Sequence, residues 1–290
     1  MNSEIKARMH EHLQERSRKI TDPAGRQVRI LEDVHALKIA DECRSSVHEV
    51  YMEALGMGIY PYRYVRNREI ISDQEQLKLA QSRVAVVGAG GLGGQVILLL
   101  ARIGMGYLVV IDHDTFDETN LNRQALCSQE ALGKSKSEEA VTVVGAINPG
   151  VETISCRLRI DSSNAQKILV GSDVVVDALD NIPDRLTLEE EVKKLDIPLV
   201  HGAVAGFEGQ IMTIFPQDHG LGNLYGRGGP VKETKQSPES VFGVPALIPA
   251  VIGTFQVMEV LKIILNRGTT FRNMMVHMDL EAGRMNEFLF

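Results

Sequence analysis

A glycine-rich turn and a strand-end carboxylate are the first residues of this sequence whose types and spacing could perform chemistry. The segment 83–94 reads Arg-Val-Ala-Val-Val-Gly-Ala-Gly-Gly-Leu-Gly-Gly, and Gly88, Gly90 and Gly93 fit the pattern G-x-G-x-x-G. An apolar strand that turns in this way into a helix offers unpaired backbone N–H groups to a phosphate. Asp112 follows a second apolar stretch, where a carboxylate can accept hydrogen bonds from ribose hydroxyls. These features predict a nucleotide site.

Several amide and cationic side chains follow Asp112. They are Asn120, Asn122, Arg123 and, after a glycine, Lys136. Such groups suit the charge of a polyphosphate, and a hydride carrier does not require so many of them. The glycine turn and the aspartate by themselves would fit a nicotinamide enzyme equally well. The cations therefore favour ATP, and an NAD-dependent dehydrogenase is the weaker alternative.

Asp180 and His201 lie at the ends of two further apolar stretches. Ligands of open parallel sheets bind beyond the carboxyl ends of the strands, so both residues are expected at the same edge as Asp112. Asp180 could instead cap the helix expected to begin near Ile182. His201 could contact a substrate there or serve as an ordinary edge residue.

The composition is that of a soluble globular chain. Of its 290 residues 44% are apolar, which is enough for a sizeable core, and 24% are charged. The net charge of −7 argues against nucleic acid as the main partner, because an acidic protein repels a polyanion. The first residues contain no apolar stretch typical of a secretory signal, so a cytoplasmic location is expected.

Two features exclude particular sites and segments. Cys43, Cys127 and Cys156 form no CxxC pair, so we expect neither a disulfide framework nor a zinc site. The apolar stretch Val241–Leu265 contains two prolines and two charged residues. It predicts a buried helix, and no membrane partner is expected.

From Ser82 onward, apolar stretches alternate with helical patterns, which predicts βαβ units and a largely parallel sheet. We expect strands near 83–88, 107–112, 151–156, 173–178 and 198–202. We expect helices near 92–103, 134–147, 163–170 and 184–195. Gln210–Phe215 and a strand pair within 271–290 predict an antiparallel extension. The glycine- and proline-rich segment 217–240 is typical of a lid or binding loop.

Residues 1–60 are expected to form an N-terminal helical extension, and residues 61–290 the nucleotide-binding domain. Glu4–Lys19 predicts a charged helix, and Asp22-Pro-Ala-Gly-Arg26 predicts the turn of a hairpin. Val34–Leu55 has helical periodicity and is followed by Gly56. Such an extension is most simply a packing or dimer-forming element.

Taken together and in this order, the motifs closely resemble the ThiF/MoeB/HesA family of adenylyltransferases, from about Tyr62 to the C-terminus. The motifs are Arg63-Tyr-Val-Arg66, Gly88–Gly94, Asp112-His-Asp114, Asn120–Gln124, Gly133-Lys-Ser-Lys136, Ile147-Asn-Pro149, Leu179-Asp-Asn181, Gly206–Gln210 and Gly253–Gln256. The resemblance implies a homodimer and an α/β, Rossmann-like, mostly parallel sheet of about eight strands with an antiparallel C-terminal part.

The resemblance also implies roles for individual residues. Asp112 would hold the ATP ribose, Asp180 would bind Mg²⁺, and Arg66 would reach into the partner subunit's site. The implied nucleotide-binding residues are Gly88, Gly90, Gly91, Gly93, Asp112, Asn120, Arg123, Lys136 and Asn181. The implied catalytic residues are Arg66, Arg123, Lys136 and Asp180.

The implied reaction is attack of the C-terminal Gly-Gly carboxylate of a ubiquitin-like sulfur carrier protein on the α-phosphorus of ATP, which releases pyrophosphate. A separate sulfur donor protein would act next, in the biosynthesis of thiamin, of molybdenum or tungsten cofactor, or of a similar product. Two features of many family members are absent, namely the CxxC pairs that bind zinc and a cysteine in segment 217–240. The alternatives are adenylation of a peptide or a modified tRNA base, and a non-catalytic subunit paired with an active homologue.

Overall fold

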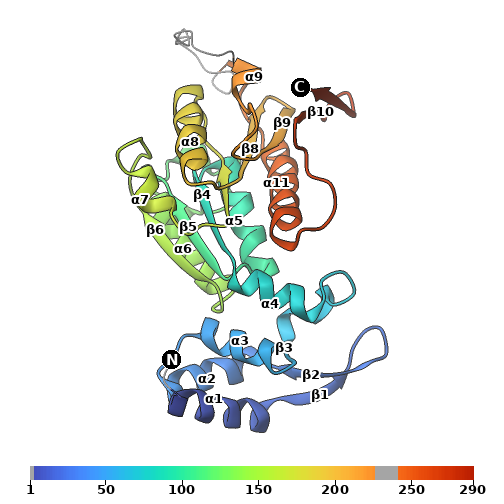
Figure 1. The fold of residues 1–290 in the computed structure, drawn as a ribbon. Helices are drawn as coiled ribbons and strands as arrows, with labels where there is room; N and C mark the ends of the chain where they lie inside the picture. Colours follow the sequence, from blue (N-terminus) through green and yellow to red (C-terminus); the bar gives the residue numbers. More distant parts are fainter. Residues whose placement is uncertain (1–2, 226–240) are drawn as a thin grey trace. The chain divides into compact units, whose positions relative to one another are not determined.

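The computed structural model describes residues 3–225 and 241–290. Contacts along the chain divide it into two compact units (Figure 1). The first consists of Met1–Ser82, Ala101–Tyr107 and Gly145–Glu152. The second consists of Arg83–Leu100, Leu108–Val144 and Thr153–Phe290. The first unit therefore contains, besides the N-terminal segment, two short stretches from the later part of the chain, Ala101–Tyr107 and Gly145–Glu152.

The first unit combines a small sheet with helices. Its elements are α1 (Ser3–Arg16), β1 (Arg18–Thr21), β2 (Gln27–Leu31), α2 (Asp33–Cys43), α3 (Val47–Gly56), β3 (Ile59–Pro61), the 3₁₀ helix η1 (Tyr62–Asn67) and α4 (Asp73–Gln81). The sheet order is β1-β2-β3, with β1 antiparallel and β3 parallel to β2. The helices contribute Met9, Leu13, Ile39 and Tyr51 to a core that β2 completes with Ile30. The expected hairpin around residues 22–26 is confirmed.

Two helix predictions in this unit were wrong in extent. The helix expected over Glu4–Lys19 ends at Arg16, because residues 18–21 pair with β2 instead. The helix expected over Val34–Leu55 is two helices. Arg44 adopts a left-handed φ of 53° and ends α2, and Ser46 begins α3 through a capping box with Glu49. The pattern Ser46-x-x-Glu49 was the signal in the sequence for this break.

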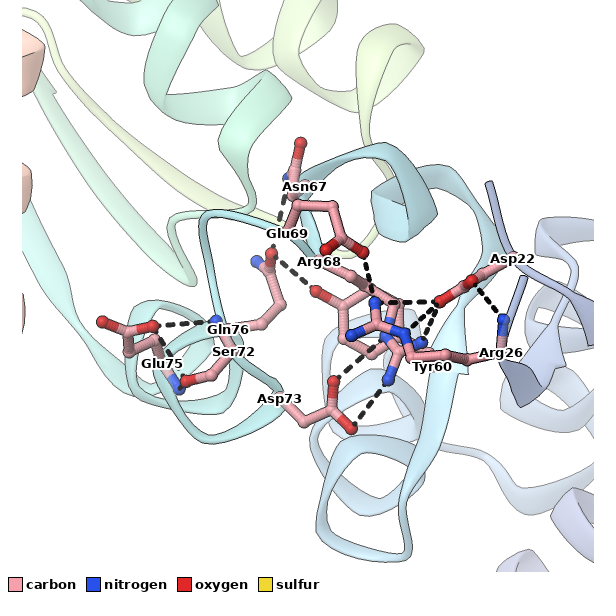
Figure 2. A network of polar contacts seen from close by, with 10 residues as sticks. All are labelled: Asp22, Arg26, Tyr60, Asn67, Arg68, Glu69, Ser72, Asp73, Glu75 and Gln76. Atoms are coloured by element: carbon pink, nitrogen blue, oxygen red, sulfur yellow. Dashed lines mark hydrogen bonds and ion pairs between the residues drawn. The ribbon is translucent and has the colours of Figure 1, made fainter. Parts of the chain in front are cut away.

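A network of ion pairs ties the hairpin to the chain before α4 (Figure 2). Asp22 is buried, and its Oδ2 accepts hydrogen bonds from Arg26 (3.0 Å) and Arg68 (3.0 Å). Arg26 also pairs with Glu69, and Arg68 with Asp73 at 3.2 Å. Figure 2 shows that these five side chains converge from the hairpin and from the segment around Arg68. The charges of one buried carboxylate and two arginines are thus matched within the network.

The motif Ile147-Asn-Pro149 has a structural role in this unit. The buried Asn148 amide donates hydrogen bonds to the Tyr64 hydroxyl (2.7 Å) and to the carbonyl of Ala101 (2.7 Å). Arg63 donates to the carbonyl of Ile147 at 2.7 Å. Burial raises the pKa of Tyr64 to about 12, so its hydroxyl stays protonated and can keep accepting from Asn148. These contacts join η1 to the last turns of two helices.

The second unit is a sheet of eight strands with helices. The strands are β4 (Arg83–Val87), β5 (Tyr107–Ile111), β6 (Glu152–Cys156), β7 (Val174–Asp177), β8 (Leu199–Ala205), β9 (Glu208–Ile214), β10 (Met274–Asp279) and β11 (Arg284–Leu289). The helices are α5 (Gly91–Ile103), α6 (Lys136–Ile147), α7 (Ala165–Leu169), α8 (Ile182–Lys194), α9 (Gly222–Tyr225) and α11 (Leu247–Leu265). Two 3₁₀ turns, η2 (Glu118–Asn120) and η3 (Gln129–Ala131), lie between β5 and α6.

The strand order in this sheet is β11-β10-β9-β8-β7-β4-β5-β6. β7 pairs in parallel with both β4 and β8, whereas β8 to β11 form successive antiparallel pairs. The expected Rossmann-like sheet with an antiparallel C-terminal part is confirmed. β4 and β7 lie side by side although 86 residues separate Val87 from Val174, so the chain reverses its direction across the sheet between these strands. Their carboxyl ends therefore form the crevice where such sheets bind ligands.

The apolar stretch Val241–Leu265 contains the expected helix, but this helix, α11, begins only at Leu247. α11 packs on β8 and β9, and its Gly253 lies so close to α5 that an added Cβ would be 3.0 Å from Cβ of Gln95. Within the described residues, α11 alone is long and apolar enough to cross a membrane by length and composition, and half of that stretch is buried in the protein. Burial against the sheet accounts for its apolar character.

Candidate nucleotide site

The glycine turn between β4 and α5 depends on two positions where a side chain cannot fit. Gly88 has a φ of +98°, and an added Cβ would lie 2.5 Å from the carbonyl oxygen of Ala178 at the end of β7. At Gly93 an added Cβ would overlap the carbonyl oxygen of Gly88. The turn is therefore packed tightly between β7 and α5. Because α5 begins at Gly91, its first unpaired N–H groups and positive dipole end lie here, which suits an anion.

An open cavity lies at the carboxyl ends of the strands, and most of the predicted site residues line it. Gly88, Gly90, Gly91, Asp112, Arg123, Lys136, Asp180 and Asn181 are among its lining residues. Other lining residues are Gln124, Arg159, Asp184, Arg185 and Pro249. The loops after β4, β5, β6 and β7 thus supply charged and amide groups to one space, as the strand-end positions predicted.

Asp112 is anchored by the backbone of the glycine turn. Its Oδ2 accepts a hydrogen bond from the N–H of Ala89 at 2.7 Å, and its Oδ1 accepts from the N–H of Asp114 at 2.8 Å. A carboxylate oxygen has two lone pairs, so each oxygen can accept a further hydrogen bond from a ribose hydroxyl. Asp112 therefore fits the predicted ribose contact and also fixes the glycine turn to the end of β5.

Lys136 is a nearly buried cation at the start of α6. Its side chain is 9% exposed, and its Nζ lies 3.1 Å from Oδ2 of Asp114. The N–H of Lys136 also donates to the carbonyl of Asp114 at 3.0 Å. Asp114 thus holds the ammonium at the cavity wall, a role that the sequence pattern Asp112-His-Asp114 did not reveal. A fixed ammonium in a partly desolvated position interacts strongly with a phosphate.

Arg123 and the amides near it are ordered by a short turn. Asn120 is buried, and its Oδ1 accepts from the N–H of Asp117 at 3.0 Å as part of the capping box of η2. Arg123 donates to the carbonyl of Thr119 (3.0 Å) and to Oδ1 of Asn122 (2.9 Å). The structure thus places Arg123 at the cavity, whereas Asn120 shapes the turn that carries it.

Gln124 is a site residue that the sequence analysis did not single out. It is buried beside Gly90, where an added Cβ would lie 3.7 Å from Nε2 of Gln124. Its Oε1 has no hydrogen-bond partner among the described residues. A buried amide oxygen without a partner costs free energy, so a hydrogen-bond donor from a ligand in the cavity would stabilise it.

The sequence left two roles open for Asp180, a ligand-binding residue or the N-cap of the following helix, and the structure gives the second role to Asn181. Asn181 is the N-cap of α8, because its Oδ1 accepts from the N–H of Asp184 at 2.9 Å. Its Nδ2 lies 3.3 Å from Oδ1 of the exposed Asp180. Asp180 is therefore not the cap, and it is an exposed residue that lines the cavity.

The residues around Asp180 fit a Mg²⁺ ion bound together with phosphates. Mg²⁺ in phosphate-transfer sites is usually held by one or two carboxylates, substrate phosphates and water. Asp180 offers an exposed carboxylate in the same cavity as Arg123 and Lys136. A second group of possible ligands, Asp112, His113 and Asp114, has donor atoms within 4.8 Å of one another. Asp114 in that group is already paired with Lys136.

Two of the lining residues, Arg159 and Asp184, form an ion pair. Arg159 donates to both carboxylate oxygens of Asp184 at 2.9 and 2.8 Å. Burial alone would raise the pKa of Asp184, but the hydrogen bonds from Arg159 and Asn181 outweigh it and hold this pKa below its ordinary value. The pair joins the loop after β6 to the first turn of α8.

Other predicted residues do not line the cavity, and part of the predicted lid lies outside the described residues. Gly93 packs the glycine turn and is not a lining residue. Arg66 is exposed on η1 in the first unit. Of the segment 217–240, residues 226–240 lie outside the described residues, so the expected lid stays a prediction. His201 is completely buried next to Asp177, beneath the strand edge at which it was expected.

The family model that matches this sequence is described as the ThiF family, and it covers residues 64–289. The chain belongs to the ThiF family. It is 39% identical over 207 residues to SAMP-activating enzyme E1 of Haloferax volcanii, which covers 70% of this chain and 76% of that protein. It is 32% identical over 262 residues to adenylyltransferase and sulfurtransferase MOCS3 of Arabidopsis thaliana, which covers 88% of this chain and 56% of that protein.

Solved structures agree with the fold. E. coli MccB aligns with a TM-score of 0.66 at 19% identity, over 79% of this chain and 69% of that chain. At such an identity the likeness concerns the fold alone. The chain spans about half the length of several relatives that it matches, the Arabidopsis protein among them. The comparisons confirm the family and the enzyme class expected from the sequence, which is that of the adenylyltransferases.

Proposed function

We propose that this chain adenylates the C-terminal Gly-Gly carboxylate of a ubiquitin-like sulfur carrier protein, with ATP and Mg²⁺ as cosubstrate and cofactor and pyrophosphate as product. The observation that carries the proposal is one cavity lined by the glycine turn, Asp112, Arg123, Lys136 and Asp180. The names of the relatives, an activating enzyme and an adenylyltransferase, support the same reaction. Sulfur would then come from a separate donor protein.

The cavity contains groups suited to the attack of a carboxylate on a phosphate. An α-carboxyl group has an ordinary pKa of about 3.3–3.7, so the nucleophile is ionised at neutral pH and needs no general base. The difficulty is the approach of two anions, which fixed positive groups reduce. Arg123 and Lys136 would neutralise the phosphates, and Asp112 would hold the ribose so that the α-phosphorus faces the carrier tail. Mg²⁺ held by Asp180 would supply further charge neutralisation.

The cysteines fit a reaction in which sulfur is not carried by this chain. Burial raises the pKa of Cys127 and of Cys156 above the ordinary value, so both thiols are protonated at neutral pH. A protonated thiol is a poor nucleophile. We therefore propose that a sulfur nucleophile of the donor protein attacks the carbonyl carbon of the acyl-adenylate directly, so that a carbon–sulfur bond forms, the bond to the phosphate oxygen breaks and AMP leaves. The same proposal expects no zinc in the protein, a cytoplasmic location and a homodimer.

Isotope exchange between pyrophosphate and ATP tests the reaction. The purified chain with Mg²⁺-ATP should catalyse exchange only when a ubiquitin-like protein ending in Gly-Gly, taken from the same cell, is present. The same carrier without its two last glycines should give no exchange. Exchange that is equally fast with the truncated carrier would contradict the proposal, as would tight binding of NAD in place of ATP.

Two variants of this chain, Asp180→Asn and Glu190→Gln, test the metal contact and its specificity in the same assay. Asp180→Asn should abolish the exchange, because an amide cannot replace the anionic oxygen ligand of Mg²⁺. Glu190→Gln removes an exposed carboxylate from the same region, on α8, and should leave exchange unchanged. A folded Asp180→Asn protein with wild-type exchange would remove Asp180 from the mechanism.

A further inference from the structure

Three ionisable side chains are buried directly beneath the turn that carries Asp180. Asp177, at the end of β7, and His201, on β8, are both 0% exposed, and Arg185 on α8 is 4% exposed. The three come from different elements and meet at one point among the apolar strands. Burying charged groups is unfavourable unless they are paired and hydrogen-bonded. Apolar residues at these buried positions would avoid this cost, which indicates that the three ionisable residues have a specific role.

Asp177 and Arg185 together bind both backbone polar groups of one residue, Leu179. Oδ1 of Asp177 accepts from the N–H of Leu179 at 3.0 Å, and the guanidinium of Arg185 donates to the carbonyl of Leu179. Nε of Arg185 lies 3.8 Å from Oδ2 of Asp177, so the two charges are also paired. The peptide groups on both sides of Leu179 are thereby fixed. Asp180 is the next residue, so its position follows from this clamp.

His201 holds the carboxylate of Asp177 in the orientation that the clamp requires. Its Nδ1 donates to Oδ2 of Asp177 at 2.7 Å, which leaves Oδ1 directed at Leu179. Its Nε2 lies 3.4 Å from Nε2 of Gln210, which also donates to the hydroxyl of Tyr225 at 3.2 Å. The amide of Gln210 is a donor in both contacts, so Nε2 of His201 must be the acceptor. This contact selects the tautomer with a proton on Nδ1.

The turn held in this way has little freedom on its other side. The carbonyl of Ala178 lies against Gly88, where even a Cβ would not fit. Gln256 of α11 donates to the carbonyls of Asp177 (2.8 Å) and Val200 (3.2 Å), which joins the ends of β7 and β8. A displacement of Leu179 would therefore change the distance between the glycine turn, where phosphates are expected, and the carboxylate of Asp180.

We propose that Asp177, His201 and Arg185 are positioning residues that set the place of Asp180 relative to the glycine turn, with the hydrogen bond from His201 to Asp177 as the decisive contact. The inference rests on the proposed Mg²⁺ contact of Asp180. It predicts that changes at His201 alter the effect of Mg²⁺ on ATP binding, although His201 itself is buried and cannot touch the nucleotide.

The test compares ATP binding with and without Mg²⁺ and needs no carrier protein. In the wild type, Mg²⁺ should tighten the binding of ATP. In His201→Ala this tightening should fall by about tenfold, the lower range for loss of a group that orients a metal ligand. The affinity for metal-free ATP should stay within about threefold, because Asp112 and the glycine turn are untouched.

Two conservative variants separate positioning from simple loss of packing. In His201→Asn the side-chain NH₂ group can occupy the place of Nδ1 and donate to Asp177, so the Mg²⁺ effect should largely return. In His201→Gln the amide reaches toward the place of Nε2 and Gln210, so the Mg²⁺ effect should stay low. The Asn and Gln variants decide the question even if His201→Ala does not fold, since both keep a polar amide in the cavity of the imidazole.

Thr213→Val is the matched control for stability. It removes the buried hydrogen bond from the hydroxyl of Thr213, on β9 of the same sheet, to Glu259, and Thr213 is not one of the side chains that hydrogen-bond to Leu179. It should lower the thermal unfolding temperature and leave the Mg²⁺ effect as in the wild type. An unchanged Mg²⁺ effect in folded His201→Gln, or an equal loss in Thr213→Val, would overturn the inference.

The outcomes also distinguish this inference from the proposed function. Wild-type protein whose ATP binding ignores Mg²⁺ would overturn the metal contact of Asp180 and the inference with it. A different result is that the wild type catalyses exchange equally well without the carrier while the His201 variants still show the expected Mg²⁺ effects. That result would overturn the proposed carrier substrate and support the positioning role.

Discussion

At the scale of single residues, the two cations that line the cavity, Lys136 and Arg123, are held in place by local partners. Lys136 is held by Asp114, and Arg123 by the carbonyl of Thr119 and the amide of Asn122. Long cationic side chains lose rotamer entropy when they bind a ligand, and fixing them beforehand removes part of that cost. The site therefore presents charge that needs little rearrangement when ATP binds.

Removing either cation should slow adenylation strongly. We expect Lys136→Ala and Arg123→Ala each to reduce the rate of carrier-dependent exchange by about 10²–10³-fold, the usual effect of losing one preorganised charge-stabilising donor. Lys134→Ala is the control, because Lys134 is an exposed neighbour that pairs with Glu139 and does not line the cavity. A rate and an ATP affinity within about threefold of the wild type would show that the substituted cation does not act on the phosphates.

The sequence could predict which residue types gather at the site, but not their division of labour. Strand-end positions placed Asp112 and Asp180 at one edge because parallel strands share their carboxyl ends. Asn181 caps α8, because an N-cap side chain must reach the N–H three residues on, whereas the neighbouring Asp180 is a lining residue of the cavity. The cluster of Asp177, His201 and Arg185 depends on contacts between β7, β8 and α8 that no local spacing encodes.

At the scale of elements, the βαβ part of the sheet was predicted almost residue by residue. Apolar strands buried on both faces read as short continuous runs, and β4, β5 and β7 show this pattern. The breaks in the first unit were missed because hydrophobic periodicity continues across Arg44–Ser46, while capping and a left-handed residue end the helix. Hydrophobic periodicity predicts which face of a helix is buried, whereas capping residues predict where the helix begins and ends.

The hairpin of the first unit should make stability depend on acid pH through Asp22. The backbone N–H of Arg26, followed by the Arg26 side chain, holds the pKa of Asp22 below its ordinary value, and Arg68 faces the same carboxylate (Figure 2). A lowered native pKa means that the stabilisation is complete above the ordinary carboxyl pKa of about 3.9. It is lost as the pH falls through the lower native value.

We therefore expect Asp22→Asn to reduce stability at neutral pH and to flatten its decline below about pH 4. Chemical unfolding measured across pH 2–7 for the two proteins checks this, and Glu190→Gln, which changes an exposed carboxyl group on α8 in the second unit, is the control. Parallel stability curves for the wild type and Asp22→Asn would show that the hairpin carboxylate does not contribute.

At the scale of the whole molecule, the division into two units follows from packing more than from sequence order. The first unit contains its own core of α1, α2, α3 and β2 and adds the last residues of α5 and α6 through Asn148. The nucleotide cavity is lined entirely by residues of the second unit. A catalytic residue from outside the second unit, such as one supplied by a partner subunit in a homodimer, would add to these lining residues.

Arg66 is the residue that tests this possibility. It is exposed on η1, and no side-chain hydrogen bond or ion pair of Arg66 is found among residues 3–225 and 241–290. If it reaches the ATP phosphates of the partner subunit in a homodimer, as the family resemblance implies, Arg66→Ala and Asp180→Asn homodimers should both be nearly inactive. A mixed dimer then contains one site that combines an intact Asp180 with an intact Arg66 from its partner.

Mixing the two inactive proteins should therefore restore activity after subunit exchange. Random exchange at equal amounts makes about half of the dimers mixed, each with one working site, so roughly a quarter of the wild-type exchange rate should return. Subunit exchange can be followed with differently tagged chains, and a mixture of Asp180→Asn with itself is the blank. If tagged chains exchange fully and no activity returns, Arg66 acts within its own chain or takes no part in catalysis.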